Sequence, residues 1–361
     1  MRDEDVEEAL KSQDNNNDNI SNLLIHIYKF ISSISKMKQT TVDQNEAALT
    51  ESILKVAKRE LREDKCTRDQ CLEQFRNWLA KNEDVQNIRT DDHFVLRFLR
   101  AKKFSVPMAE QTLLKYLNVR RTFPHMTTGL DFFDERLNDI ISNGYIYATP
   151  KRDKNGRRVI INNAHCFNAK KYNAMDQAKA HFLTYECLME DPQTQVMGLT
   201  HIGDFAGITT AHVTNWNPTE FGRLFKWGEQ SLPLRHKEIH LINVPSTLKW
   251  VVDFVKNRVS SKMRNRLNVY TSDKDLHKAV DPECLPLELG GKIPQKEMVE
   301  MWKRELAEKR DIILQLDEMK LLTDRGILRK SSHNSEKSSN QPTFVSQIES
   351  IQGSFRKLEF D

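Results

Sequence analysis

Basic side chains concentrate in one stretch of the chain, residues 232–267. This stretch holds eight lysines and arginines against two acids, a local net charge of +6 in a chain whose net charge is +4. Ammonium and guanidinium groups bind phosphate oxygens through charge-assisted hydrogen bonds, so the clustering predicts a surface for anionic headgroups. Lys262 and Arg266 are four residues apart and would share one face of a helix.

A helix is predicted over residues 246–259, after Pro245, with Ser246 or Thr247 as its amino-terminal cap. One apolar stripe follows from helical spacing and consists of Leu248, Val251, Val252, Val255 and Val259. Trp250 and Phe254 would project from the opposite side, which predicts contact with a lipid, a partner or a membrane. The alternative is an ordinary buried helix with a solvated basic neighbour.

Motifs of other function classes are missing from the sequence. It contains no GxSxG nucleophile elbow, no GxxxxGK[ST] phosphate loop, no GxGxxG dinucleotide motif and no Cys-x5-Arg phosphatase loop. The HKEIH segment, His236 to His240, would lie on a strand without an HExxH helix, which favours structural histidines over a metal site. The mild pI of about 8.6 and the Val-rich setting of the aromatics argue against RNA binding. We therefore expect no enzyme, no metal site and no nucleic-acid partner.

Composition is consistent with a large domain, a smaller one and polar tails. The chain has 361 residues, 38% of them hydrophobic, and a mean hydropathy of −0.64. It has no apolar run of eighteen residues, so we expect any membrane contact to be peripheral. Five scattered cysteines without a CxxC pair follow an acidic start that lacks a secretory signal. This pattern predicts reduced thiols and a cytoplasmic protein.

Hydrophobic periodicity divides the chain into five parts. They are a largely disordered extension (1–44) with a short amphipathic helix over 20–37, a helical bundle (45–125), an α/β domain (140–295), a carboxy-terminal helix (296–324) and a disordered tail (325–361). In the bundle, Thr67 is the expected cap of the second helix, and Arg97, Arg100, Lys102 and Lys103 are expected on the outside of the third. One charged helix is expected over 297–322.

Strands and helices alternate over residues 145–270. Strands are predicted at 145–149, 158–163, 196–205, 238–243 and 267–270, and helices at 175–190, 218–231, 247–267 and 273–279. Alternation of this kind predicts an α/β fold with a mostly parallel sheet.

Taken together, three segments resemble the CRAL-TRIO family of lipid-transfer proteins. DDHFVLRFLRAKKF is similar to the family's amino-terminal helical signature, and IHLIN and LPLELGG are similar to the core of its lipid-binding domain. The resemblance covers residues 72–303 in family order. It is strongest to the branch that holds α-tocopherol transfer protein, cellular retinaldehyde-binding protein and the clavesins.

The resemblance implies a pocket for one hydrophobic lipid, of isoprenoid, retinoid or tocopherol type, and a mobile gate helix that opens at a membrane. The gate would be the helix over 247–259. Positions that match the family's phosphoinositide-binding cleft are Lys102, Arg235, Lys237, Lys262 and Arg266. Positions that match its pocket are Ala178, His181, Tyr185, Leu199, Gly203, Trp227, Leu232, Leu234 and Ile239.

These features predict a monomeric transfer protein of the cytoplasm. It would carry no cofactor other than its lipid and would associate peripherally with phosphoinositide-containing membranes, endosomal or other trafficking membranes among them. The tails could recruit trafficking proteins. The alternative function is a lipid-sensing, phosphoinositide-binding adaptor in endosomal trafficking that produces no net transfer.

Overall fold

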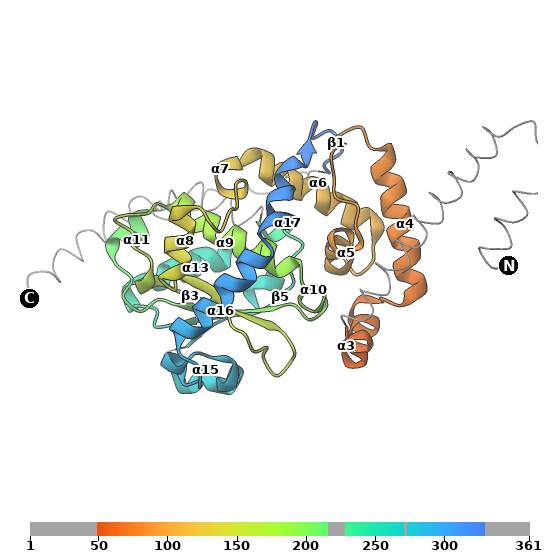
Figure 1. The fold of residues 1–361 in the computed structure, drawn as a ribbon. Helices are drawn as coiled ribbons and strands as arrows, with labels where there is room; N and C mark the ends of the chain where they lie inside the picture. Colours follow the sequence, from red (N-terminus) through yellow and green to blue (C-terminus); the bar gives the residue numbers. More distant parts are fainter. Residues whose placement is uncertain (1–48, 216–227, 271–272, 329–361) are drawn as a thin grey trace, which may run out of the picture. The chain divides into compact units, whose positions relative to one another are not determined.

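The computed structural model describes residues 49–215, 228–270 and 273–328, and the predicted amphipathic segment over 20–37 lies outside them (Figure 1). The amino-terminal helical region consists of α3 (Glu51–Val56), a π-helical turn η1 (Ala57–Leu61), α4 (Lys65–Lys81), α5 (Asp92–Ala101) and α6 (Val106–Thr122). Asp64 caps α4 by accepting a hydrogen bond of 2.9 Å from the backbone N of Thr67, so the prediction of Thr67 as the cap was wrong. Asp91 caps α5 in the same way.

A five-stranded sheet lies at the centre of the second region. Its strands, in the order β2-β3-β4-β5-β6, are β2 (Ile146–Ala148), β3 (Arg158–Asn163), β4 (Leu199–Asp204), β5 (His236–Ile242) and β6 (Leu267–Tyr270). β2 pairs antiparallel with β3, and the other three pairings are parallel. The predicted α/β class with a mostly parallel sheet and an amino-terminal helical bundle is thereby confirmed.

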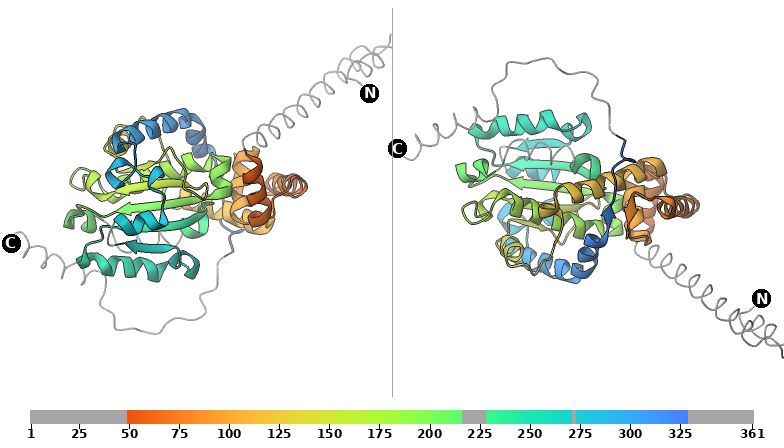
Figure 2. Two further views of the ribbon diagram at one scale, coloured as in Figure 1. Left: turned by 90° about the horizontal axis from the view of Figure 1, so that it is seen from below. Right: turned by 90° about the horizontal axis from the view of Figure 1, so that it is seen from above.

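Helices flank this sheet. They are α7 (Pro124–Thr127), α8 (Glu135–Ser142), η2 (Ala164–Cys166), α9 (Ala174–Met189), α10 (Pro192–Met197), α11 (Thr210–Thr214), η3 (Ser246–Leu248), α13 (Lys249–Arg258), α14 (Ser261–Arg264), α15 (Asp273–Ala279), η4 (Pro282–Cys284), η5 (Leu287–Leu289), α16 (Gln295–Glu308), α17 (Arg310–Leu314) and η6 (Gln315–Glu318). In both views of Figure 2, the blue α16 and the teal α13 lie at opposite margins with the strands between them. Among the described residues, no helix has the length and apolar character needed to cross a bilayer.

Three predicted boundaries were wrong. The strand expected from residue 196 begins at Leu199, because α10 ends at Met197 and Gly198 turns the chain with φ +86°. The helix expected over 247–267 is interrupted at Ser260, which caps α14. The helix expected over 297–322 ends at Glu308, and β7 (Lys320–Leu321) pairs with β1 (Val85–Gln86) of the helical region. Of the helix predicted over 218–231, residues 218–227 lie outside the described part.

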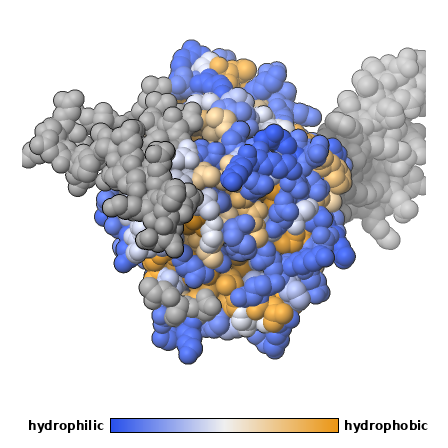
Figure 3. All heavy atoms as spheres, turned by 90° about the vertical axis from the view of Figure 1, so that its left-hand side faces the viewer, coloured by the Kyte–Doolittle hydropathy of each residue, from blue (hydrophilic) through white to orange (hydrophobic). Residues whose placement is uncertain are grey.

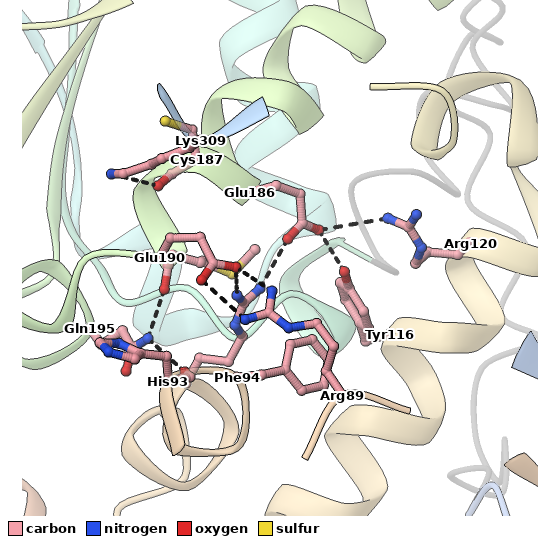
Figure 4. Close-up of polar contacts among 12 residues, drawn as sticks. Arg89, His93, Phe94, Tyr116, Arg120, Glu186, Cys187, Glu190, Gln195 and Lys309 are labelled. Carbon is pink, nitrogen blue, oxygen red and sulfur yellow. Dashed lines mark hydrogen bonds and ion pairs between the residues drawn. The ribbon is translucent and has the colours of Figure 1, made fainter. Parts of the chain in front are cut away.

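The inner face of α5 carries charge as well as apolar side chains. Arg97 and Arg100 are each 1% exposed, so the prediction that they lie outside was wrong. Arg97 donates to Glu186 of α9 at 3.0 Å and also bonds Glu190, while Arg100 bonds Glu63 at 2.6 Å. Figure 4 shows Arg89, Tyr116 and Arg120 converging on the same two α9 carboxylates. This buried ionic network ties the helical region to the sheet region.

Candidate functional site

Five polar aromatic side chains gather between α9 and the sheet. Tyr145, which follows α8, bonds His181 of α9 at 2.8 Å, and Tyr185 lies one turn further along α9. Rings of His201 and His236 stack 6.3 Å apart on neighbouring strands, and the Tyr185 ring lies 5.7 Å from that of His236. His181, Tyr185, Ala178 and Leu199 were predicted pocket residues, whereas Tyr145, His201 and His236 were missed.

His181 takes part in a chain of hydrogen bonds. Gln177 donates to the hydroxyl of Tyr145 at 2.7 Å, and that hydroxyl is hydrogen-bonded to Nε2 of His181 at 2.8 Å. Burial lowers the pKa of His181 to about 4, with the neighbouring His236 as a second cause. Burial, followed by the charge of Arg266, lowers the pKa of His236 to about 4.

These side chains are desolvated but keep accessible surface. His181, Tyr185, His201 and His236 are half-buried, yet burial lowers the pKa of His201 well below its usual range and raises that of Tyr185. Burial is the largest cause of the shift in all four groups, so the cluster lies in a part of the fold that favours uncharged side chains.

Acidification is expected to destabilise the fold through this cluster. An unfolded histidine has a pKa of about 6.5, whereas those of His181 and His236 are about 4 in the folded chain. Between these values only the unfolded chain binds the protons, so this stability is complete above pH of about 6.5 and is lost as the pH falls toward 4. Each shift in pKa corresponds to roughly 3 kcal/mol in the free energy of unfolding.

Urea unfolding between about pH 7 and pH 5 measures this loss. The variant H236N should flatten the pH dependence, and H125Q, at an exposed histidine of α7, should leave it unchanged. Equal pH dependence in H236N and the unsubstituted chain would exclude His236 as a source of the acid sensitivity.

The remaining predicted pocket residues lie on the same strands or near them. Gly203 is buried on β4, where an added Cβ would come within 3.2 Å of Leu241 Cδ2, and Ile239 is half-buried on β5. Leu232 and Leu234 are half-buried in the segment before β5. Trp227 lies outside the described residues.

The predicted gate corresponds to η3 and α13. Leu248 and Val252 are buried at 2% and 7% exposure, which agrees with the predicted inner stripe. Trp250 and Val259 are half-buried. The side chains of Val251, Phe254 and Val255 are outside what the structure describes. In Figure 3, apolar surface gathers on the lower half of the face that lies at the left of Figure 1.

Two of the predicted headgroup-binding cations share one acid. Arg235 precedes β5 and Lys237 lies within it, and both donate to the same carboxylate oxygen of Glu60, Arg235 at 2.9 Å and Lys237 at 2.6 Å. Burial works to raise the pKa of Glu60, but the hydrogen bonds and charges of these cations outweigh it and the pKa is lowered. Glu60 was missed by sequence reasoning because it lies 175 residues from Arg235.

The other three cations approach one another with less compensation. Lys262 of α14 is exposed, and burial together with the charges of Arg266, Lys103 and Arg235 lowers its pKa. The pKa of Lys102, at the carboxyl end of α5, is lowered by burial, Lys115 and Lys262. Glu229 is the acid that opposes both shifts. Segments far apart in sequence thus bring six cations within electrostatic reach of one another, and we call this group the basic cleft after the family feature that the sequence predicts: Lys102, Lys103, Arg235, Lys237, Lys262 and Arg266.

Comparison with known proteins supports the resemblance found in the sequence. Residues 142–291 match the model of the CRAL/TRIO domain, and residues 69–117 match that of the CRAL/TRIO amino-terminal domain. Lys102 and Lys103 of the basic cleft lie within residues 69–117, and its other four cations lie within residues 142–291.

Relatives align over most of their own length. Clavesin-2 from Homo sapiens is 28% identical over 262 residues, which is 72% of this chain and 80% of the relative. Alpha-tocopherol transfer protein-like from Homo sapiens is 28% identical over 245 residues, or 68% of this chain and 71% of the relative. The crystal structure of Sfh5 is 16% identical, with a TM-score of 0.42, over 73% of this chain and 98% of that one.

Proposed function

Because the chain belongs to the CRAL/TRIO family of lipid-binding and lipid-transfer proteins, we propose that it holds one hydrophobic lipid and exchanges it at phosphoinositide-containing membranes. The observation that carries the proposal is the basic cleft beside α14. Burial, and after it the charges of neighbouring cations, lowers the pKa values of Lys262 and Lys102, as expected of a site that lacks enough negative charge. A phosphorylated headgroup supplies that charge.

The lipid would lie beside the polar aromatic cluster between α9 and the sheet. Apolar surface gains about 25 cal/mol per Å² on burial, so a lipid that buries about 400 Å² gains about 10 kcal/mol. Release into water is correspondingly slow. Exchange at a membrane avoids this barrier because the bilayer replaces the apolar surroundings as the pocket opens.

The ligand that fits best is a lipid with an uncharged polar end. His236 Nδ1 is a buried polar atom with no hydrogen-bond partner among the described residues. A hydroxyl or carbonyl group of the lipid would pair with it, according to the tautomer of the imidazole, and would remove the cost of that unpaired atom. A wholly hydrocarbon lipid would leave His236 Nδ1 unpaired. An isoprenoid, retinoid or tocopherol-like molecule has the required combination of apolar body and polar end.

α13 is the segment that would open. It lies at the margin of the sheet region, next to α14 of the basic cleft (Figure 2). A headgroup that binds α14 therefore contacts the helix that directly follows the gate. The membranes that carry phosphoinositides on their cytoplasmic face, endosomal membranes included, are the sites where we propose the protein works.

Native mass spectrometry of the purified folded protein tests the ligand. We expect a mass increment of one lipid per chain, and extraction should yield an apolar molecule with a hydroxyl or carbonyl group. The same protein measured after denaturation is the control and should lose the increment. A folded protein that carries no lipid and takes none up from vesicles would contradict the proposal.

A further inference from the structure

Glu60 occupies a place in the basic cleft that phosphate oxygens would otherwise take. Its carboxylate oxygen accepts from Lys237 at 2.6 Å and from Arg235 at 2.9 Å. The side chains of Arg235 and Lys237 are 12% and 19% exposed and that of Glu60 is 32% exposed, so an incoming anion can reach all three. One acid thus compensates two cations that come from another region of the chain.

The position of Glu60 suits an acid whose carboxylate a ligand can displace. It lies in η1, a π-helical turn, and π-helical segments are frequent at functional sites. Its side chain also pairs with Arg59, at 3.7 Å, and the Arg59 side chain is 73% exposed. Exposed pairs of this kind contribute little stability. When a phosphate takes its place beside Arg235 and Lys237, release of Glu60 therefore leaves no buried charge without a partner.

We propose that Glu60 is an internal counter-anion that sets the charge a ligand must carry to enter the cleft. A phosphate ester carries about −1.5 to −2 at neutral pH, against −1 for a carboxylate, and offers three acceptor oxygens. A ligand with two or more phosphates outcompetes Glu60 for Arg235 and Lys237 while it also contacts Lys262. A ligand with a single phosphate gains little binding free energy, because its contacts with Arg235 and Lys237 replace those that Glu60 already makes.

The inference rests on the proposed function, since it assigns selectivity to the same cleft. The chemistry it selects is a polyphosphorylated ring, which a membrane lipid or a soluble inositol phosphate could supply. Removal of the charge on Glu60 should therefore reduce the ratio of the affinity for a ligand with two phosphates to the affinity for a ligand with one.

The test compares E60Q with the unsubstituted chain on three ligands. They are vesicles with phosphatidylinositol 4-phosphate, vesicles with phosphatidylinositol 4,5-bisphosphate, and soluble inositol trisphosphate. Glutamine keeps the size of the side chain and one acceptor oxygen, and it replaces the other oxygen and the negative charge with an uncharged NH2 group. We expect E60Q to bind the monophosphate vesicles about fivefold more tightly, with a smaller gain for the bisphosphate. The matched control is E51Q in the preceding helix, where Glu51 pairs with Lys55 and is 83% exposed.

The outcomes separate the two proposals. The unsubstituted chain and E60Q could bind bisphosphate vesicles and the other ligands with equal affinity. In that case Glu60 does not select ligands by charge, and the inference is wrong while the proposed function stands. If neither chain binds any of the ligands, the proposed function falls as well. A gain seen with inositol trisphosphate alone supports the inference and assigns the cleft to a soluble ligand. A carboxylate NMR signal of Glu60 that shifts on addition of inositol trisphosphate tests the same displacement without any substitution.

Discussion

Replacement of Arg97 by alanine is expected to lower the free energy of unfolding by about 3–5 kcal/mol. The side chain is 1% exposed and pairs with Glu186 at 3.0 Å and with Glu190, whose own side chains are 1% and 6% exposed. Its guanidinium also lies 4.7 Å from the centre of the Phe94 ring. The alanine would leave two buried carboxylates with fewer donors and a cavity beside Phe94.

Urea unfolding of R97A against R121A measures this effect. Arg121 lies near the end of the neighbouring α6, where its pair with Asp324 spans 3.9 Å and both side chains are about 40% exposed. Its loss should cost no more than about 0.5 kcal/mol. Equal stabilities of the two variants would mean that the buried network does not hold the helical region to α9.

The double charge reversal K103E/K262E is expected to weaken binding to phosphoinositide vesicles about thirtyfold or more. Both lysines are exposed, and Lys103 lies close enough that its charge contributes to the lowered pKa of Lys262, after burial and the charge of Arg266. Each basic side chain near an anionic surface contributes about 1 kcal/mol, so removing two costs about 2 kcal/mol and reversing them costs more. Arg266 is a poorer choice for this test because it donates to the backbone oxygen of His236 and so supports β5.

Vesicle co-sedimentation at constant salt measures the change. The control is K296E/K320E, which alters the net charge equally at two exposed lysines of α16 and β7. It should bind nearly as the unsubstituted chain does. Equal losses in the two double variants would show that overall charge attracts the membrane and that the cleft has no special role.

Periodic features of this fold could be predicted from sequence, since they depend on local patterns. Helical spacing over residues 45–123 predicted the amino-terminal bundle, and alternation over 145–270 predicted the parallel sheet. Charge at a helical face was less informative. Arg97 and Arg100 follow the spacing of an exposed face, but Glu186 and Glu63, which make their burial possible, are 89 and 37 residues away. A helix pattern contains no information about such partners.

The candidate site shows the same division. Family resemblance predicted His181 and Tyr185 of α9 as pocket residues. His181 lies three residues after Ala178, and Tyr185 lies four residues after His181, so the three share one helix face. The resemblance missed His201 and His236, because a strand pattern does not reveal which neighbours a half-buried histidine meets. Glu60 was missed for a related reason, since an acid in a charged helix gives no sign that it pairs with a distant strand.

Bound lipid should leave the protein faster when a phosphorylated headgroup occupies the basic cleft, and the lipid content of the protein in the presence of vesicles reports this release. Protein with its co-purified lipid is mixed with vesicles that contain or lack phosphatidylinositol 4,5-bisphosphate, and native mass spectrometry follows the lipid-bound fraction with time. We predict faster loss of lipid with the bisphosphate for the unsubstituted chain and for K296E/K320E, and no acceleration for K103E/K262E. Equal release rates from the unsubstituted chain on both kinds of vesicle would contradict the account.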